Sequence, residues 1–401
     1  MFWEQQLDQF VHGIGERANV PLKLKLWNGG EYALGKSPKV TLTLPGAKAL
    51  KFLMPPSLDN LAEGYVRGHF DVAGKAADIV EAAGALARAG VEKTGRFGRM
   101  MHAAVHTKKR DAEDIAYHYD VSNDFYKLWL DPRMVYSCAY FADAEEDLAT
   151  AQLQKLDHIL NKVMLQPGER LLDIGCGWGA LAIRAAERGA KVVGITLSKN
   201  QAEEARERVA RAGLTGQVDI RIQDYRDIDE RFDKITSVGM FEHVGLKNLS
   251  TYFGIMRKLL KDGGLALNHG ITSTDPDSGS TPYGAAEFIG KYVFPHGELP
   301  HISLVLKEME AAGLEPLDVE TMRRHYARTL QIWAENYEAQ TEKIKQMVPD
   351  LTYRVWRVYL AGCAYAFAQH WVSIHQVLVC KAGAECYLNP TPWNRGYIYG
   401  K

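Results

Sequence analysis

The sequence predicts an α/β chain in two parts, a small α+β module followed by a doubly wound, mostly parallel sheet with helices on both faces. Three observations support this prediction. The 401 residues exceed the usual size of one hydrophobic core. Strand-like alternation of apolar and polar residues occurs near the start, and from about residue 169 apolar runs alternate with helical segments. We expect the parts to span residues 1–110 and 111–401.

The first part contains two half-buried strands and a helix. Residues 22–26 (LKLKL) and 40–44 (VTLTL) have the period of two that is typical of strands, with turn residues in the WNGGEY segment between them. The segment ADIVEAAGALARAG predicts a helix. A basic run between Arg88 and Arg110, with the single acid Glu92, ends the module. This run fits a contact with anionic lipid headgroups and a solvated linker equally well.

Composition excludes several classes of protein. A net charge of -1 provides no global field for nucleic acid. Five cysteines, an odd number without paired CxxC spacing, argue against a disulfide framework and a metal site and favour a reducing cytoplasm. The first residues carry acids where a signal peptide would be basic. Residues 358–380 lack formal charges but contain several polar side chains, so we expect a core helix followed by a buried strand.

The first apolar run of the second part, LLDIG, leads into a glycine-rich turn. Gly175, Gly177 and Gly179 allow the backbone to turn tightly near a ligand, and the following helix offers free N–H groups to an anion. Asp173 could accept a hydrogen bond from an ammonium group. The GxGxG spacing, rather than GxGxxG, favours a ligand with an amino acid moiety such as S-adenosylmethionine over a dinucleotide.

The second and third runs end in neutral and acidic side chains. Thr196 and Gln201 could bind ribose hydroxyls, although Ser198 with Gln201 also fits a helix capping box, and both roles are compatible. Asp224 could accept the exocyclic amine of adenine or be a solvated charge. Ligands of such sheets bind at the carboxyl ends of the strands, where these residues lie.

The fourth and fifth runs end near Glu242 and His269. A carboxylate and an imidazole should therefore converge above neighbouring strands. Either residue alone is more often a paired polar group near the core. Their convergence beside the expected cofactor favours catalysis.

Several segments, in order and spacing, resemble the cyclopropane fatty acid synthases over about residues 115–340. The resemblance implies a class I S-adenosylmethionine-dependent methyltransferase fold, with a seven-stranded sheet whose last strand, around residues 374–380, is antiparallel. It also implies a cyclopropane-fatty-acyl-phospholipid synthase, which methylates the cis double bond of a phospholipid acyl chain. The segments are YHYDVSNDFYKLWLDPRMVYSCAYF, LLDIGCGWG, GITLSKNQ, QDYRDI, MFEHVG, HGIT, FIGKYVFPHGELP and HYARTL.

The resemblance further implies the ligands of the site. A bicarbonate ion would be held by Glu242, His269 and Tyr326, with main-chain contacts at Cys138 and Ile271, and would act as the base. The implied partners are membrane phospholipid and, transiently, the inner face of the membrane, with a homodimer possible. Gly270 departs from the family pattern, and we expect it to change loop freedom rather than ligands. The implied contacts to S-adenosylmethionine are Tyr136, Ser137, Gly175, Gly177, Thr196, Leu197, Gln201 and Asp224.

The chemistry requires a base beside a carbocation in a dry place. Aromatic faces would stabilise the cation, and the candidates are Tyr117, Tyr136, Tyr140, Phe141 and Tyr292. Cys138 has no base of its own in the sequence, so a positional role is expected. Three alternatives stay open: a methylene- or methyl-branched fatty acid synthase, a small-molecule N-methyltransferase of the related plant type, and a non-catalytic lipid-binding protein.

Overall fold

The computed structural model describes residues 13, 19–54, 57–90, 121–278, 286–294, 297–383, 388 and 391–399. The chain forms two compact units. The first comprises residues 1–101, 280–295 and 330–371, and the second comprises residues 102–279, 296–329 and 372–401. The expected boundary at residues 110 and 111, and most of the basic run, lie outside the described residues. Of that run, Arg88 donates a hydrogen bond to the hydroxyl of Tyr365 in the first unit.

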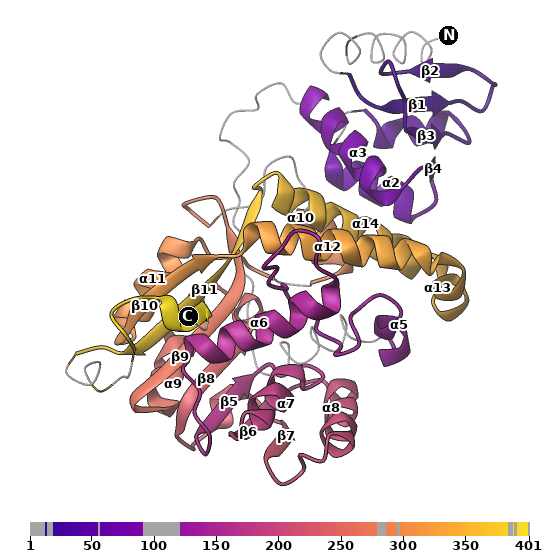
Figure 1. Cartoon of the computed structure of the whole chain (residues 1–401). Coiled ribbons are helices and arrows are strands. Elements are labelled where there is room, and N and C mark those ends of the chain that lie inside the picture. Colours follow the sequence, from indigo (N-terminus) through magenta and orange to yellow (C-terminus); the bar gives the residue numbers. More distant parts are fainter. Residues whose placement is uncertain are drawn as a thin grey trace. The chain divides into compact units, whose positions relative to one another are not determined.

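The second unit is built on a seven-stranded sheet (Figure 1) in the order β10-β11-β9-β8-β5-β6-β7. All pairs are parallel except those of β11, which runs antiparallel to both β9 and β10. The predicted sheet and its antiparallel last strand are thus confirmed. The strands are β5 (Arg170–Ile174), β6 (Lys191–Thr196), β7 (Val218–Ile222), β8 (Phe232–Val238), β9 (Leu260–Ser273), β10 (Leu314–Thr321) and β11 (Val372–Lys381).

Successive residues of the central strands point to opposite faces of this sheet, and each face is covered by helices. Leu171 and Val192 belong to one apolar cluster, whereas their neighbours Leu172 and Val193 belong to the other. Strands buried on both faces explain why the sequence shows continuous apolar runs here rather than alternation. The first cluster includes α6 (Leu148–Lys162), α7 (Ala180–Glu187) and α8 (Lys199–Arg211), and the second includes α9 (Leu249–Leu259) and α11 (Ile302–Ala311).

The strand order reverses between β5 and β8. From β5 the chain adds β6 and β7 on one side of the sheet, and then returns to place β8 against the other side of β5. Such a reversal opens a crevice at the carboxyl ends of the two strands.

The first unit contains a four-stranded sheet in the order β2-β1-β3-β4. The two predicted strands are β1 (Leu22–Lys25) and β3 (Val40–Thr43). The edge strands β2 (Glu31–Ala33) and β4 (Asp71–Ala73) were not predicted, because three residues are too few to show alternation, and β2 begins inside the predicted turn. The helices are η1 (Ala47–Phe52), α2 (Leu58–Val66), α3 (Ala76–Gly90), α10 (Ala286–Tyr292), most of α12 (Arg323–Ala339), α13 (Thr341–Met347) and α14 (Asp350–Ala368).

Polar contacts explain why two later segments belong to the first unit. Arg357 of α14 donates hydrogen bonds to the hydroxyl of Tyr65 at 3.0 Å and to the carbonyl of Gly74 at 2.7 Å. Its guanidinium also pairs with Glu338 at 2.9 Å. In α10, the hydroxyl of Tyr292 donates to Glu63 of α2 at 2.8 Å. Side chains far apart in sequence thus hold the N-terminal module to C-terminal helices.

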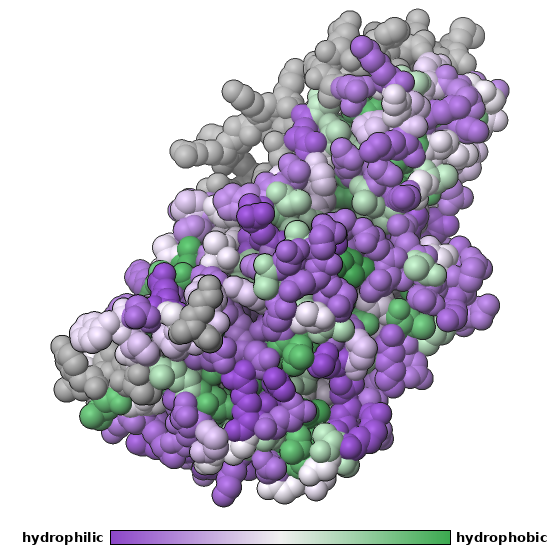
Figure 2. All heavy atoms as spheres, in the orientation of Figure 1, coloured by the Kyte–Doolittle hydropathy of each residue, from purple (hydrophilic) through white to green (hydrophobic). Residues whose placement is uncertain are grey.

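The apolar stretch 358–380 forms the end of α14 followed by β11, as predicted. Within the described ranges, no helix is both long and apolar enough to span a bilayer. The visible face in Figure 2 is mostly polar, with apolar side chains scattered over it. Cys138, Cys176 and Cys363 are free, whereas Cys380 is disulfide-bonded, a pairing that the argument against a disulfide framework did not anticipate. An odd cysteine count does not exclude a single pair.

Candidate active site

A pocket opens at the crevice between β5 and β8. Its empty space is about 1170 Å³, part of which is open to solvent. Nine of the ten residues predicted to contact S-adenosylmethionine line it. Gly179 is the exception, because it caps α7 in a left-handed conformation and a Cβ there would face Ala205. The nine residues are Tyr136, Ser137, Asp173, Gly175, Gly177, Thr196, Leu197, Gln201 and Asp224.

The glycine-rich turn after β5 has the predicted conformation. Gly175 and Gly177 both have positive φ values, of 76° and 53°. Asp173 lies just before the turn, is 2% exposed and accepts a hydrogen bond from the Thr236 hydroxyl at 2.9 Å. Burial raises the pKa of Asp173 to about 6. A cationic partner in the pocket would therefore stabilise its charged form.

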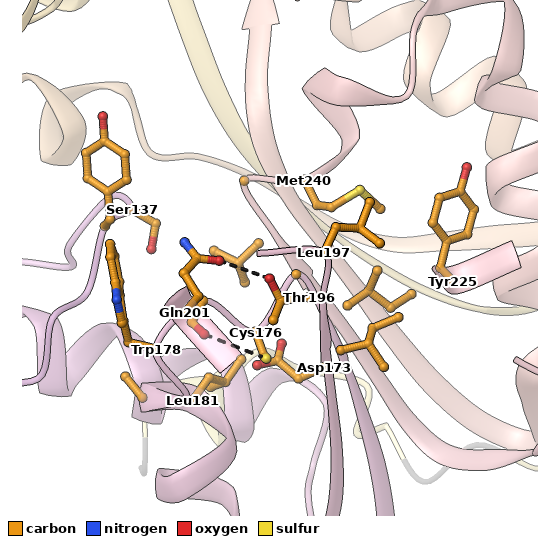
Figure 3. A pocket seen from close by; sticks show the side chains of 18 of the residues that line it. Ser137, Asp173, Cys176, Trp178, Leu181, Thr196, Leu197, Gln201, Tyr225 and Met240 are labelled. Carbon is orange, nitrogen blue, oxygen red and sulfur yellow. Dashed lines mark hydrogen bonds between the residues drawn. The ribbon is translucent and has the colours of Figure 1, made fainter. Parts of the chain in front are cut away.

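Of the two roles considered for the loop after β6, the structure shows the helix cap, and ribose binding by Thr196 and Gln201 stays a prediction. The Ser198 hydroxyl caps α8 by accepting the Gln201 N–H at 3.3 Å. The Thr196 hydroxyl donates to Gln201 Oε1 at 3.0 Å, and in Figure 3 the amide nitrogen of Gln201 points away from Thr196. Asp224 lines the pocket, but its carboxylate already forms an ion pair with Arg226 at 2.7 Å.

One wall of the pocket is the segment 134–137, which other elements hold in place. Asp131 accepts the Val135 N–H at 2.8 Å, and Gln152 of α6 donates to the Ser137 carbonyl at 2.9 Å. Lys155, one turn further along α6, donates to the Ser137 hydroxyl at 3.0 Å. Neither Gln152 nor Lys155 was predicted from the sequence. A polar residue in an amphipathic helix gives no signal that it faces inward.

Glu242 and Ile271 are joined directly. Glu242 lies in η3 (Phe241–His243), which follows β8, and its Oε1 accepts the Ile271 N–H of β9 at 2.7 Å. The other oxygen, Oε2, is buried and has no hydrogen-bond partner. Burial raises the pKa of this carboxyl to about 7, against an ordinary value of 4.5.

His269 lies two residues before Ile271 on β9 and directly opposite Gln376 of β11. The Gln376 amide Nε2 donates to His269 Nδ1 at 3.0 Å. Burial lowers the pKa of His269 well below its ordinary value, so the ring is neutral and carries its proton on Nε2. That Nε2 is buried without a hydrogen-bond partner. The ring thus presents an N–H group without an acceptor. Gln376, which donates the hydrogen bond to Nδ1, was not predicted as a site residue from the sequence.

Met322 links Cys138 and Tyr326 to the same strands. The Met322 carbonyl accepts the Tyr326 N–H at 3.0 Å and lies 3.8 Å from Cys138 Sγ, while its N–H donates to the Ile374 carbonyl at 2.9 Å. Ile374 pairs with Ile271 across β11 and β9. Contacts through Met322 and Ile374 thus connect Cys138, Tyr326 and Ile271, and none of the five residues predicted to hold bicarbonate lines the large pocket. Burial raises the pKa of the Cys138 thiol far above its ordinary range, which fits a positional role.

The interpretation of Gly270 as a source of loop freedom is wrong. Gly270 lies inside β9 and does not have a positive φ. It is required for space, because a Cβ at this position would lie 1.9 Å from Cε1 of Phe241. The Phe241 ring therefore packs on the bare backbone of β9, immediately before Glu242 in the chain.

The aromatic candidates are divided among different places. Tyr136 lines the pocket and packs against Tyr126 with ring centres 5.7 Å apart. Tyr140 stacks on His158 and on His325 at 4.2 and 4.8 Å. Tyr292 bonds to Glu63 within the first unit, and Tyr117 lies outside the described residues.

The fold and the pocket define an S-adenosylmethionine-dependent methyltransferase, in agreement with comparisons to known proteins. The family model for mycolic acid cyclopropane synthetase matches residues 106–377, and the chain belongs to this family. A model for a domain of unknown function matches residues 10–94. Among the described residues, no cluster of His, Cys, Asp and Glu could hold a metal ion.

Individual relatives cover different shares of the chain. A probable fatty acid methyltransferase of Pseudomonas putida is 47% identical over 95% of this chain and 97% of its own. The cyclopropane-fatty-acyl-phospholipid synthase of Escherichia coli K12 is 40% identical over 65% of this chain and 66% of its own. The structure of the mycolic acid cyclopropane synthase CmaA1 complexed with SAH and CTAB matches with a TM-score of 0.64 and 35% identity, covering 67% of this chain and 98% of that one.

Proposed function

We propose that the chain is a cyclopropane-fatty-acyl-phospholipid synthase. It transfers the methyl group of S-adenosylmethionine to the cis double bond of an unsaturated phospholipid acyl chain and then closes a cyclopropane ring. The activities named for the Pseudomonas and Escherichia relatives support a lipid acyl substrate.

The observation that carries the proposal is two buried polar atoms without hydrogen-bond partners, Glu242 Oε2 in η3 after β8 and His269 Nε2 on the neighbouring strand β9. An unpaired buried polar atom costs about 1–3 kcal/mol, so a ligand that satisfies both is expected. The two atoms suit bicarbonate, because the neutral imidazole offers an N–H to an oxygen and the carboxylate can accept the hydroxyl. Tyr326 and the backbone at Cys138 and Ile271 are the further proposed contacts.

The residues of the chain have separate tasks in this proposal. Asp173, Thr196 and Gln201 orient the methyl donor at the carboxyl end of β5 and β6. Glu242 and His269, both more than 90% buried, hold the anion where water is excluded. Exclusion of water matters because a carbocation beside water would be hydrated to an alcohol.

The chemistry balances without a redox partner. The alkene π electrons form a bond to the methyl carbon as its bond to sulfur breaks, which leaves a carbocation on the acyl chain. Loss of one proton from the new methyl group frees the electron pair that closes the ring. Glu242 and His269 would hold bicarbonate, which would supply the base for that proton.

The test is incubation of the protein with S-adenosylmethionine and vesicles of cis-monounsaturated phospholipid, with and without bicarbonate, followed by mass spectrometry of the fatty acids. A cyclopropane product that depends on bicarbonate is expected. A methylene- or methyl-branched product would instead identify the chain as a branched fatty acid synthase. Cofactor binding without any methylated lipid would identify a non-catalytic lipid-binding protein.

Peripheral contact with the inner face of a cytoplasmic membrane is part of the same proposal, since the substrate lies there. Co-sedimentation of the protein with vesicles of the same phospholipid measures this contact. A protein that acts on dispersed lipid but never sediments with vesicles would contradict it.

A further inference from the structure

Lys155 is a buried cation in the wall of the pocket. It lies in the middle of α6, is 2% exposed, and lines the pocket together with Asp173. Its ammonium donates to the Ser137 hydroxyl at 3.0 Å. Throughout the described part of the chain, no carboxylate lies within salt-bridge distance of Lys155. A buried ammonium with one neutral acceptor is poorly compensated for the water it has lost.

The fold itself does not require a lysine here. Lys155 lies on the buried face of α6 beside Leu156 and Ile159, where an apolar side chain of similar length would pack without a desolvation cost. By contrast, the other buried lysine of the helix, Lys162, is paired with Asp318 at 3.0 Å. Lys155 therefore differs from a structural ion pair: Asp131 and Asp173 act on it only from beyond salt-bridge distance, and a ligand carboxylate would supply the close counter-charge.

The pocket presents both signs of charge without joining them. Asp173 is also 2% exposed and accepts a hydrogen bond from Thr236 through Oδ1. Burial lowers the pKa of Lys155 to about 8 and raises that of Asp173 to about 6, as expected for charges that lack close counter-ions. A zwitterion that places its ammonium by Asp173 and its carboxylate by Lys155 would restore both charged forms.

We propose that Lys155 and the Ser137 hydroxyl form the subsite that binds the α-carboxylate of the methionine moiety of S-adenosylmethionine. The subsite distinguishes an α-amino acid from an amine of the same length. The proposal rests on the assignment of the pocket to S-adenosylmethionine, and it adds residues that the glycine-rich turn alone does not predict. In Figure 3, Ser137 lies on the side of the pocket opposite Tyr225, with the glycine-rich turn below it.

The test compares two ligands by isothermal titration calorimetry, with no turnover involved. One is S-adenosylhomocysteine, and the other is its analogue without the carboxylate, 5′-deoxy-5′-(3-aminopropylthio)adenosine. The wild-type chain should bind the first about tenfold to a hundredfold more tightly, as for one charge-assisted contact. In Lys155→Met this ratio should fall to near one, with the affinity for the analogue nearly unchanged.

Gln152→Leu is the matched control. Gln152 lies one turn earlier on α6 and holds the same segment through the Ser137 carbonyl, but it carries no charge. This variant should weaken both ligands equally and keep their ratio. If Lys155→Met also weakens both ligands equally, Lys155 only supports the wall, and the proposal is overturned.

A second variant keeps the proposal testable if Lys155→Met does not fold, as judged by circular dichroism. Ser137→Ala removes the hydroxyl from the subsite and should reduce the preference for the carboxylate by a few fold. An unchanged ratio would count against the subsite. Failure of the wild-type chain to bind S-adenosylhomocysteine at all would instead refute the assignment of the pocket, and with it the proposed function.

Discussion

Glu242→Gln should stabilise the ligand-free protein at alkaline pH while removing most of its turnover. The Glu242 carboxyl is buried, and its pKa is about 7 in the folded chain against an ordinary value of 4.5. This difference corresponds to about 3 kcal/mol of folding free energy. The stability that the protonated carboxyl provides is complete below pH 4.5 and is lost as the pH rises through about 7. Glutamine stays neutral and keeps an oxygen that can accept the Ile271 N–H.

Urea unfolding of both proteins in bicarbonate-free buffer measures this effect. At about pH 5 the two free energies of unfolding should agree within roughly 1 kcal/mol, and at about pH 8.5 the variant should be more stable by roughly 3 kcal/mol. Added bicarbonate should stabilise the wild-type chain but not the variant. An equal gain at both pH values would refute the electrostatic reasoning, and wild-type turnover in the variant would refute the proposed role of Glu242.

Three further substitutions test other parts of the site. Gln376→Leu should lower turnover about tenfold without weakening S-adenosylhomocysteine binding, because the donor that places the His269 proton on Nε2 is lost. ¹⁵N NMR of the His269 ring should then show a mixture of the two neutral tautomers. An unchanged spectrum would contradict the proposed role of Gln376. Gly270→Ala should cost about 1–3 kcal/mol in urea unfolding, because the methyl group displaces the Phe241 ring, and a neutral effect would show that the ring has room to move. Asp173→Asn should weaken S-adenosylhomocysteine about tenfold or more by calorimetry, and unchanged affinity would remove Asp173 from the ammonium subsite.

The sheet could be predicted because local patterns determine it. Parallel strands buried on both faces give continuous apolar runs, and β5, β6 and β8 each coincide with such a run. The membership of residues 330–371 in the first unit could not be predicted. It depends on contacts such as Arg357 with Tyr65, which join side chains 292 positions apart. A charged residue on a helix gives the same local signal whether it faces solvent or another segment.

The candidate site, like the fold, could be predicted from the sequence only in part. Glycines and loop residues after strands were found from sequence, because the turn and the strand ends impose their residue types. Lys155 and Gln376 were missed, because each lies inside a regular helix or strand whose period gives no sign of a functional side chain. Gly270 was noticed but misinterpreted, because sequence does not distinguish a glycine needed for backbone freedom from one needed for space.

The unsatisfied polar groups are a stronger functional signal than the shape of the pocket. Glu242 Oε2, His269 Nε2 and Gln376 Oε1 are all buried without hydrogen-bond partners. At about 1–3 kcal/mol each, their cost is a large part of the stability of an ordinary domain, and apolar side chains at these positions would avoid it. Such a cost is offset when a ligand with complementary donors and acceptors binds. A small anion with its own hydroxyl group would meet that requirement at Glu242 and His269, whereas an acyl chain cannot, which is why we assign these polar atoms to the proposed base rather than to the lipid.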